Sequence, residues 1–399
     1  MTPFPLALDG IRVIDLSRVI AGPWCGALLA DLGADVIKVE DTGAGDESRT
    51  WPPHRDGESA AYLLFNRNKR SMTLDLKAPE GVDVIKALVR TADVLVENFR
   101  TGTMDSFGLG YDVLAEINPR LIYCSVSAFG RTGPRKDAPG YEALMQAFSG
   151  IMSITGEPDG QPVRSAVSFL DLTTGILCTL GVSAAVIQRE KTGLGQRVDG
   201  SLLETAVSLL AYHAEGYLLA GTVPRPLGSG HPSLSPYRNF RCGDGQWVFI
   251  AAANDRFWQK LARALGLAEL ATDPRFARNL ERVKHRAELE AILEKAVAGY
   301  QREPLLELLE AADVPATPVN TVAQVMSDAQ TLERGIVQRA QHARLGDIPV
   351  IGTPLRFSRM APGVRSAAPQ RGEHTESILA EHGYSTARIR ELRDKKVIL

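Results

Sequence analysis

The feature that most constrains the fold is an alternation, over the first 130 residues, between short runs rich in β-branched residues and segments with helical patterning. The candidate strands occupy residues 11–16, 34–40, 71–76, 92–99 and 121–127. The segments between them are long enough to be helical crossovers, which join parallel strands in a right-handed sense. The sequence therefore predicts an α/β fold whose large domain is Rossmann-like, with a largely parallel sheet.

A second, smaller domain is expected because 399 residues exceed the roughly 250 to 300 that one hydrophobic core usually serves. Residues 140–220 have helical patterning, and a stretch rich in Pro, Gly and Ser follows at 222–236. Beyond it, NFRCGDGQWVFIAAA predicts two strands joined by a turn, and helices follow over residues 255–312. We predict a large domain over 1–224, a small α+β domain over 225–325, and a C-terminal segment over 326–399 that returns to the large domain.

Composition excludes several classes of partner. The 45 basic and 47 acidic residues are well mixed and give a net charge of -2, so we expect no nucleic acid partner. The sequence has no run of 18 or more uninterrupted apolar residues and no secretory signal, so we expect no membrane association and a cytoplasmic protein. The four cysteines form no CxxC pair and the histidines no HxxxH pair, which predicts buried reduced thiols and no metal site.

The expected ligand site follows from the fold. In open α/β sheets, ligands bind outside the carboxyl ends of the strands, which here means the segments that begin at Ser17, Glu40, Asn98 and Ser127. A GxGxxG sequence is missing at the first strand-to-helix turn, which instead contains DLSRVIAGPWCG. We therefore predict a cofactor other than a nicotinamide dinucleotide.

Six ordered segments together resemble the class III CoA-transferases of the CaiB/BaiF type, which include formyl-CoA transferase and the carnitine CoA-transferases. They are GIRVIDLSRVIAGP (10–23), LGADVIKVE (32–40), NRNKRSMTLDLK (66–77), ADVLVENFR (92–100), FLDLTTG (169–175) and GEHT (372–375). The resemblance covers essentially the whole chain. It implies an interlocked, ring-like homodimer and coenzyme A, carried as acyl-CoA, as the co-substrate.

Asp171 is the residue to which the resemblance assigns the chemistry, as the covalent nucleophile. A carboxylate is suited to this role because it is ionised at pH 7 without a separate base and can hold an activated acyl group. Asp171 also directly precedes a long apolar helical run, where the helix N-terminus stabilises negative charge. Taken from the residues alone, an ordinary helix N-cap is the alternative.

The resemblance implies further contacts to the substrates. The residues expected to contact CoA are Val19, Ala21, Leu74, Lys77, Asn98 and Phe99, although Lys77 is equally well explained as a solvated lysine. Tyr141 and Glu142 match a pair close to the nucleophile, and Gly228, Ser229 and Gly230 partly match a glycine-rich loop that covers the active site and supplies backbone N–H donors.

Departures from the family pattern alter two expectations. Asp41 and Ser106 stand where some relatives have basic residues, so we expect the CoA phosphates to be bound by Arg70, Arg100 or Lys38. Ile20 replaces the polar residue of formyl-CoA transferase, which disfavours oxalate or formate. We expect a small dicarboxylate instead, because Arg49, Arg164 and Arg238 are available to clamp a second carboxylate.

The predicted function is transfer of CoA from an acyl-CoA donor such as succinyl-CoA to a carboxylic acid, through an aspartyl mixed anhydride and an aspartyl-CoA thioester. One alternative is an acyl-CoA racemase of the same fold, which needs a histidine between about 125 and 145. The sequence has none between His54 and His213. The other alternative is a Rossmann-type binding protein that does not use CoA.

Overall fold

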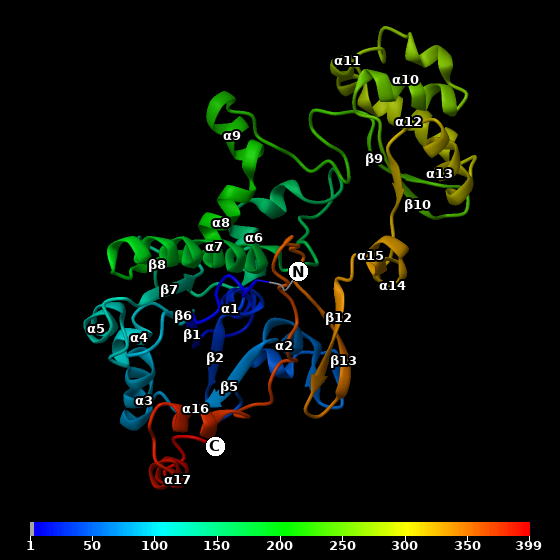
Figure 1. The fold of residues 1–399 in the computed structure, drawn as a ribbon. Coiled ribbons are helices and arrows are strands. Elements are labelled where there is room, and N and C mark those ends of the chain that lie inside the picture. The colour runs from blue at the N-terminus through cyan, green and yellow to red at the C-terminus, as the bar shows by residue number, and fades with distance from the viewer. Residues whose placement is uncertain (1–3) are drawn as a thin grey trace. The chain divides into compact units, whose positions relative to one another are not determined.

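A computed structural model describes residues 4–399 and divides them into two compact units (Figure 1). The first comprises the chain up to Ser149, Ser165–Ala214 and Arg334–Leu399; the second comprises Gly150–Arg164 and Glu215–Glu333. These boundaries differ from those expected at 224 and 325. One of them falls within helix α9, which has no buried residue, and residues 150–164 join the second unit, where the Gly228 N–H donates to the Gly156 carbonyl at 2.8 Å.

The first unit is built on a six-stranded sheet with the order β5-β2-β1-β6-β7-β8, in which every pairing is parallel. Its strands are β1 (Arg12–Asp15), β2 (Asp35–Glu40), β5 (Lys69–Thr73), β6 (Val94–Glu97), β7 (Ile122–Ser127) and β8 (Arg197–Ser201). Strand order reverses between β1 and β6, as in doubly wound nucleotide-binding folds. This confirms the predicted Rossmann-like class and adds one strand, β8, that was not predicted.

Helices cover both faces of this sheet because its central strands are apolar on both sides. Val13 of β1 packs with Cys25, Leu29 and Val182 on one face, whereas its neighbour Ile14 packs on the opposite face. The helices of the unit are α1 (Ala21–Asp31), α2 (Ala60–Phe65), α3 (Pro79–Val89), α4 (Thr103–Ser106), α5 (Tyr111–Ile117), α6 (Glu142–Phe148), α7 (Phe169–Thr192), α8 (Leu202–Leu209), α16 (Thr375–Glu381) and α17 (Thr386–Asp394). Its minor elements are η1 (Glu47–Thr50) and the hairpins β3 (His54–Arg55) with β4 (Glu58–Ser59) and β12 (Val337–His342) with β13 (Gly346–Ile351).

The second unit has its own core and the expected α+β composition. An antiparallel sheet of order β11-β10-β9 packs on helices around the fully buried Trp258 and Phe240. Its elements are η2 (Ile151–Ile154), β9 (Tyr237–Arg241), β10 (Trp247–Ala251), α10 (Asp255–Ala264), η3 (Ala268–Ala271), α11 (Asn279–Lys284), α12 (Arg286–Val297), α13 (Arg302–Ala311), β11 (Ala316–Pro318), α14 (Val322–Ser327) and α15 (Ala329–Glu333), and α9 (Ala211–Ala220) runs into it.

Helix α7 positions the start of the candidate site. Its buried side packs on the sheet through Cys178, Val182 and Ala185, and Gly193 in the left-handed conformation ends it. Helix α7 is also long and apolar enough to cross a membrane. Core helices of globular proteins meet the same criterion of length and composition. All four cysteines of the chain are buried and unbridged.

Candidate active site

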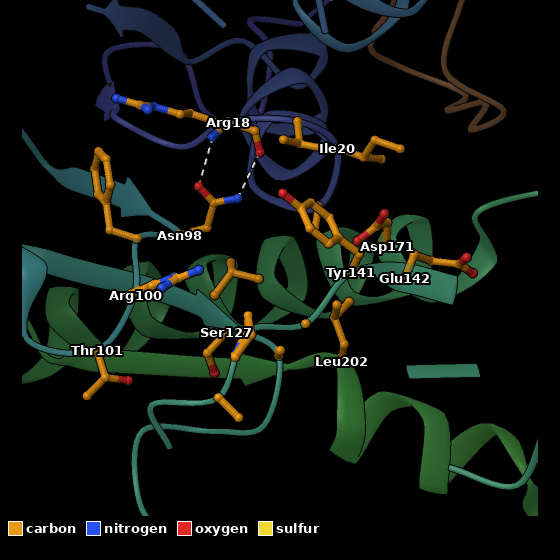
Figure 2. A pocket seen from close by; sticks show the side chains of 18 of the residues that line it. Arg18, Ile20, Asn98, Arg100, Thr101, Ser127, Tyr141, Glu142, Asp171 and Leu202 are labelled. Carbon is orange, nitrogen blue, oxygen red and sulfur yellow. Dashed lines mark hydrogen bonds between the residues drawn. The ribbon is translucent and has the colours of Figure 1, made fainter. Parts of the chain in front are cut away.

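Two strand-end loops meet where the strand order reverses. The Arg18 N–H, just after β1, donates to Asn98 Oδ1 at 2.8 Å, and Asn98 Nδ2, just after β6, donates to the Arg18 carbonyl at 2.8 Å (Figure 2). This reciprocal pair fixes the two loops side by side at the switch point of the sheet, which is the position where doubly wound folds bind ligands.

A cavity of about 350 Å³ opens at this point. Eight of the predicted site residues line it: Val19, Ala21, Asn98, Phe99, Arg100, Tyr141, Glu142 and Asp171. Leu74 and Lys77 line a second, smaller cavity of about 70 Å³ instead. Arg18 and Phe99 line both cavities, so the two hollows adjoin one another along these residues.

Asp171 is buried at the cavity wall and is the third residue of α7. Ser168 occupies the N-cap position, so Asp171 is not the plain N-cap of the alternative interpretation. Gly175, one turn further on, allows α7 to approach α1, because a Cβ there would lie 2.7 Å from the Ala21 carbonyl. This close approach brings the first turn of α7 to the loop that follows β1.

Glu142 lies beside Asp171 on the same side of the cavity (Figure 2). Burial, together with the charge of Glu142, raises the pKa of Asp171 to about 7. Gln146 holds Glu142 in place: its Nε2 donates to Glu142 Oε1 at 2.6 Å, and its Oε1 accepts the Ser165 N–H at 2.9 Å. Two carboxylates in one buried site, one with a raised pKa, are typical of acid-base or nucleophilic chemistry.

Arg49 does not take the role that the sequence predicted for it. Its Nε and Nη2 each donate to Glu40 at 2.7 Å, its guanidinium lies 3.5 Å from the centre of the Tyr62 ring, and it lines neither cavity. The charge of Arg49 is therefore already matched inside the fold, which removes it as a clamp for a substrate carboxylate. Arg238, another predicted clamp, likewise pairs with Glu290 at 2.6 Å.

Two of the expected phosphate ligands are also engaged elsewhere. Lys38 is fully buried against Asp46 at 2.8 Å, and Arg70 forms ion pairs with Asp35 and Glu381. Arg100 does line the larger cavity. Of the three candidates, only Arg100 is therefore placed to contact a ligand.

Three basic residues of the cavity were not predicted from the sequence: Arg18, Arg131 and Lys136. Arg131 pairs with Glu97 at 2.8 Å. Arg18 lies inside the first family segment. Its position next to Val19, just after β1, could have indicated that it faces the cavity. Lys136 lies in the irregular stretch GRTGPRKDAPG after β7, where no periodicity indicates a direction.

The glycine-rich loop belongs to the second unit. Gly228 adopts a positive φ of 58°, and Ser229 Oγ accepts the Asn239 N–H at 3.0 Å. The predicted contact of Gly228, Ser229 and Gly230 with substrate remains a prediction.

Histidine is missing from the residues that line the larger cavity, so the acid-base pair of the racemase alternative is not present there. Within residues 4–399, no group of three or more His, Cys, Asp or Glu side chains is arranged to hold a metal ion.

A doubly wound fold with two buried carboxylates at a switch-point cavity is typical of an enzyme that uses acid-base or nucleophilic chemistry. Comparison with known families makes this specific: the model of CoA-transferase family III matches residues 8–375, and the chain belongs to that family. It is a CoA-transferase, with CoA as co-substrate.

Relatives agree over nearly the whole length. The chain is 42% identical to a succinate–glutarate CoA-transferase from Agrobacterium fabrum, over 94% of this chain and 95% of that protein. It is 39% identical to the human succinyl-CoA:glutarate CoA-transferase, over 94% and 85%. The crystal structure of a CaiB/BaiF family protein from Brucella suis superposes with a TM-score of 0.86 at 42% identity, covering 95% of this chain and all of that one.

Proposed function

We propose that this CoA-transferase moves CoA from succinyl-CoA to a small dicarboxylate, with Asp171 as the nucleophile. The observation that carries the proposal is the position of Asp171, buried at the wall of the switch-point cavity beside Glu142. The names of the Agrobacterium and human relatives, both of which pair succinate or succinyl-CoA with glutarate, support the choice of substrates.

The proposed reaction keeps a carbonyl group activated, as a thioester or as an anhydride, through four exchanges. The Asp171 carboxylate attacks the donor thioester, forming a mixed anhydride and releasing the CoA thiolate. The thiolate attacks the aspartyl carbonyl, which forms an aspartyl-CoA thioester and releases the donor acid. The acceptor carboxylate then attacks this thioester, and the freed thiolate attacks the acceptor carbonyl of the new anhydride, giving the product acyl-CoA and regenerating Asp171.

A raised pKa suits this role. A carboxylate with a pKa of about 7 is partly ionised at neutral pH, and its ionised form is more basic, and so more nucleophilic, than that of an exposed aspartate.

The two adjoining cavities suggest how the acyl-CoA lies. The thioester must reach Asp171 in the larger cavity, so the nucleotide end is proposed to lie over the smaller one, which is lined by Leu74, Leu76, Lys77 and Phe99. Arg18 lines both cavities and its guanidinium lies 5.1 Å from the centre of the Phe99 ring. We assign Arg18 to the phosphates between the two ends, with Arg100 and Lys136 as further cations of the larger cavity.

The outer face of α7 supports the expected homodimer. Ile176, Leu177, Leu180 and Ile187 are all exposed there, and such a continuous apolar face on a soluble protein marks an interaction surface. We propose that a second copy covers this face in an interlocked, cytoplasmic homodimer. Light scattering after size exclusion should give twice the mass of one chain, and Leu180→Glu should reduce it; a monomeric wild type would contradict the proposal.

The substrate class is tested by comparing acceptors matched in length. With succinyl-CoA as donor, glutarate should yield glutaryl-CoA and free succinate, whereas pentanoate, which lacks the second carboxylate, should react at least roughly 10-fold more slowly. Equal rates with both acids would refute the dicarboxylate assignment. Absence of transfer across a broad panel of donors and acceptors would refute the proposed function.

A further inference from the structure

The loop that joins β1 to α1 contains a strained residue. Val19 has a φ of 74°, in the left-handed region, which a β-branched residue very rarely adopts. The turn is tight as well, because a Cβ on Gly22 would lie 2.3 Å from Ser17 Cβ. Val19, Ile20 and Ala21 all line the larger cavity, so the strained turn forms part of its wall. Strain of this kind persists only where the surroundings impose it.

A buried ion pair holds this turn from behind the cavity. The Val19 N–H donates to Asp46 Oδ1 at 3.2 Å, and Lys38 Nζ donates to the Ser17 carbonyl. Lys38 Nζ also lies 2.8 Å from Asp46 Oδ2, and both side chains are fully buried. The pair therefore binds the backbone on either side of Arg18, at the Ser17 carbonyl and the Val19 N–H. Asn98 binds the backbone N–H and carbonyl of Arg18 itself.

The other carboxylates near Lys38 have cations of their own, and Asp46 also caps η1 by accepting from Ser48. Asp15 and Glu40 also face Lys38, but Asp15 pairs with Lys69 at 2.8 Å and Glu40 with Arg49. Burial alone would raise the pKa of Asp46, but Lys38 and the Ser48 hydrogen bonds outweigh it and lower that pKa to about 2. Asp46 thus remains an anionic acceptor for the Val19 N–H throughout the neutral range.

We propose that Lys38 and Asp46 are positioning residues that hold residues 17–20 in the strained turn and thereby shape the acyl-CoA wall of the cavity. The proposal rests on the function proposed above, because it takes acyl-CoA as the occupant. Neither residue lines the cavity, so each acts through the backbone of Ser17 and Val19.

Glycine separates this role from general structural support, because it adopts a positive φ without strain. Asp46→Ala should lower kcat/KM for the acyl-CoA at least 10-fold, mainly through KM. Adding Val19→Gly should recover most of that loss. Adding Val19→Ala, which also shortens the side chain but keeps a Cβ, should recover little. If Asp46→Ala does not fold, Asp46→Asn takes its place, because its one amide oxygen cannot replace both Oδ2, which accepts from Lys38, and Oδ1, which accepts the Val19 N–H.

Thermal unfolding and near-UV circular dichroism establish that each variant is folded. A folded Asp46 variant with wild-type kcat/KM, or equal recovery by Val19→Gly and Val19→Ala, would overturn the proposal. CoA binding by calorimetry keeps the two proposals distinct. If the wild type binds CoA but transfers it to no acid, the proposed function fails, while glycine-specific recovery of binding still supports the positioning role. A wild type that does not bind CoA overturns both.

Discussion

Glu142 and Asp171 share one buried side of the cavity, and burial together with the charge of Glu142 raises the pKa of Asp171 to about 7. Because the nucleophile must be ionised, kcat/KM should rise with pH and level off above 7; at pH 6 only about a tenth of Asp171 is ionised. Glu142→Gln removes the charge but keeps an oxygen for Gln146, so its pH profile should shift to lower pH. An unshifted profile would show that Glu142 does not influence the nucleophile.

The same raised pKa predicts an effect on stability. An aspartate that titrates near 3.8 when unfolded and near 7 when folded binds more protons in the folded state between these values, so stability falls as pH rises from about 4 to 7. The loss is on the order of 4 kcal/mol. Asp171→Asn has no carboxyl group to titrate, so this loss does not occur. Its free energy of unfolding in urea should exceed that of wild type at pH 8, and the difference should shrink toward pH 4. A difference that does not depend on pH would contradict the assignment.

Arg49 should act on stability and not on substrate affinity. Glu40 is fully buried, so Arg49→Leu leaves its charge without its cation and should reduce the free energy of unfolding by about 3 kcal/mol. Adding Glu40→Gln should restore part of the loss. Urea unfolding measures both effects. If Arg49→Leu left stability unchanged and raised only the KM for the acceptor, Arg49 would be a clamp for the substrate carboxylate after all.

Arg18 should govern affinity for the acyl-CoA. Arg18→Gln should raise its KM roughly 10-fold and change kcat much less, because a phosphate contact is made in both ground and transition states. Arg135→Gln is the matched control, since Arg135 stacks on Phe148 and lines neither cavity. Equal effects of both substitutions would indicate a general influence of charge and not a contact.

The sequence predicted the strands of the fold where an adjoining apolar run or a turn signal marks them. The five strands expected in the first domain are present, and NFRCGDGQWVFIAAA forms β9 and β10. Strand β8, Arg197–Ser201, was missed because its sequence RVDGS has few apolar residues, as an edge strand permits. The assignment of residues 150–164 to the second unit depends on contacts with distant segments such as Gly156 with Gly228, which no local pattern encodes.

The residues of the candidate site could be predicted where they lie in the family segments. Which charged residues face the cavity was harder to predict. The segments located Asp171, Asn98 and Val19, all of which line the cavity. They did not show which arginines and lysines are held by short ion pairs: Arg49 and Lys38 are bound to Glu40 and Asp46 at 2.7 and 2.8 Å. Arg18, whose exposed pair with Asp41 is long at 4.0 Å, and Lys136 face the cavity. Pairing between charges depends on tertiary geometry, which the spacing of residues along the chain does not reveal.

Covalent catalysis by Asp171 is tested most directly by intact mass. The wild type, Asp171→Ala and Asp137→Ala are each incubated with succinyl-CoA and quenched, and their intact masses are recorded by mass spectrometry. Asp137→Ala is the control, because Asp137 is a second aspartate of the same cavity. We expect a CoA-sized adduct on wild type and Asp137→Ala that hydroxylamine removes, and no adduct on Asp171→Ala. An adduct that persists in Asp171→Ala, or transfer activity that survives this substitution, would contradict it.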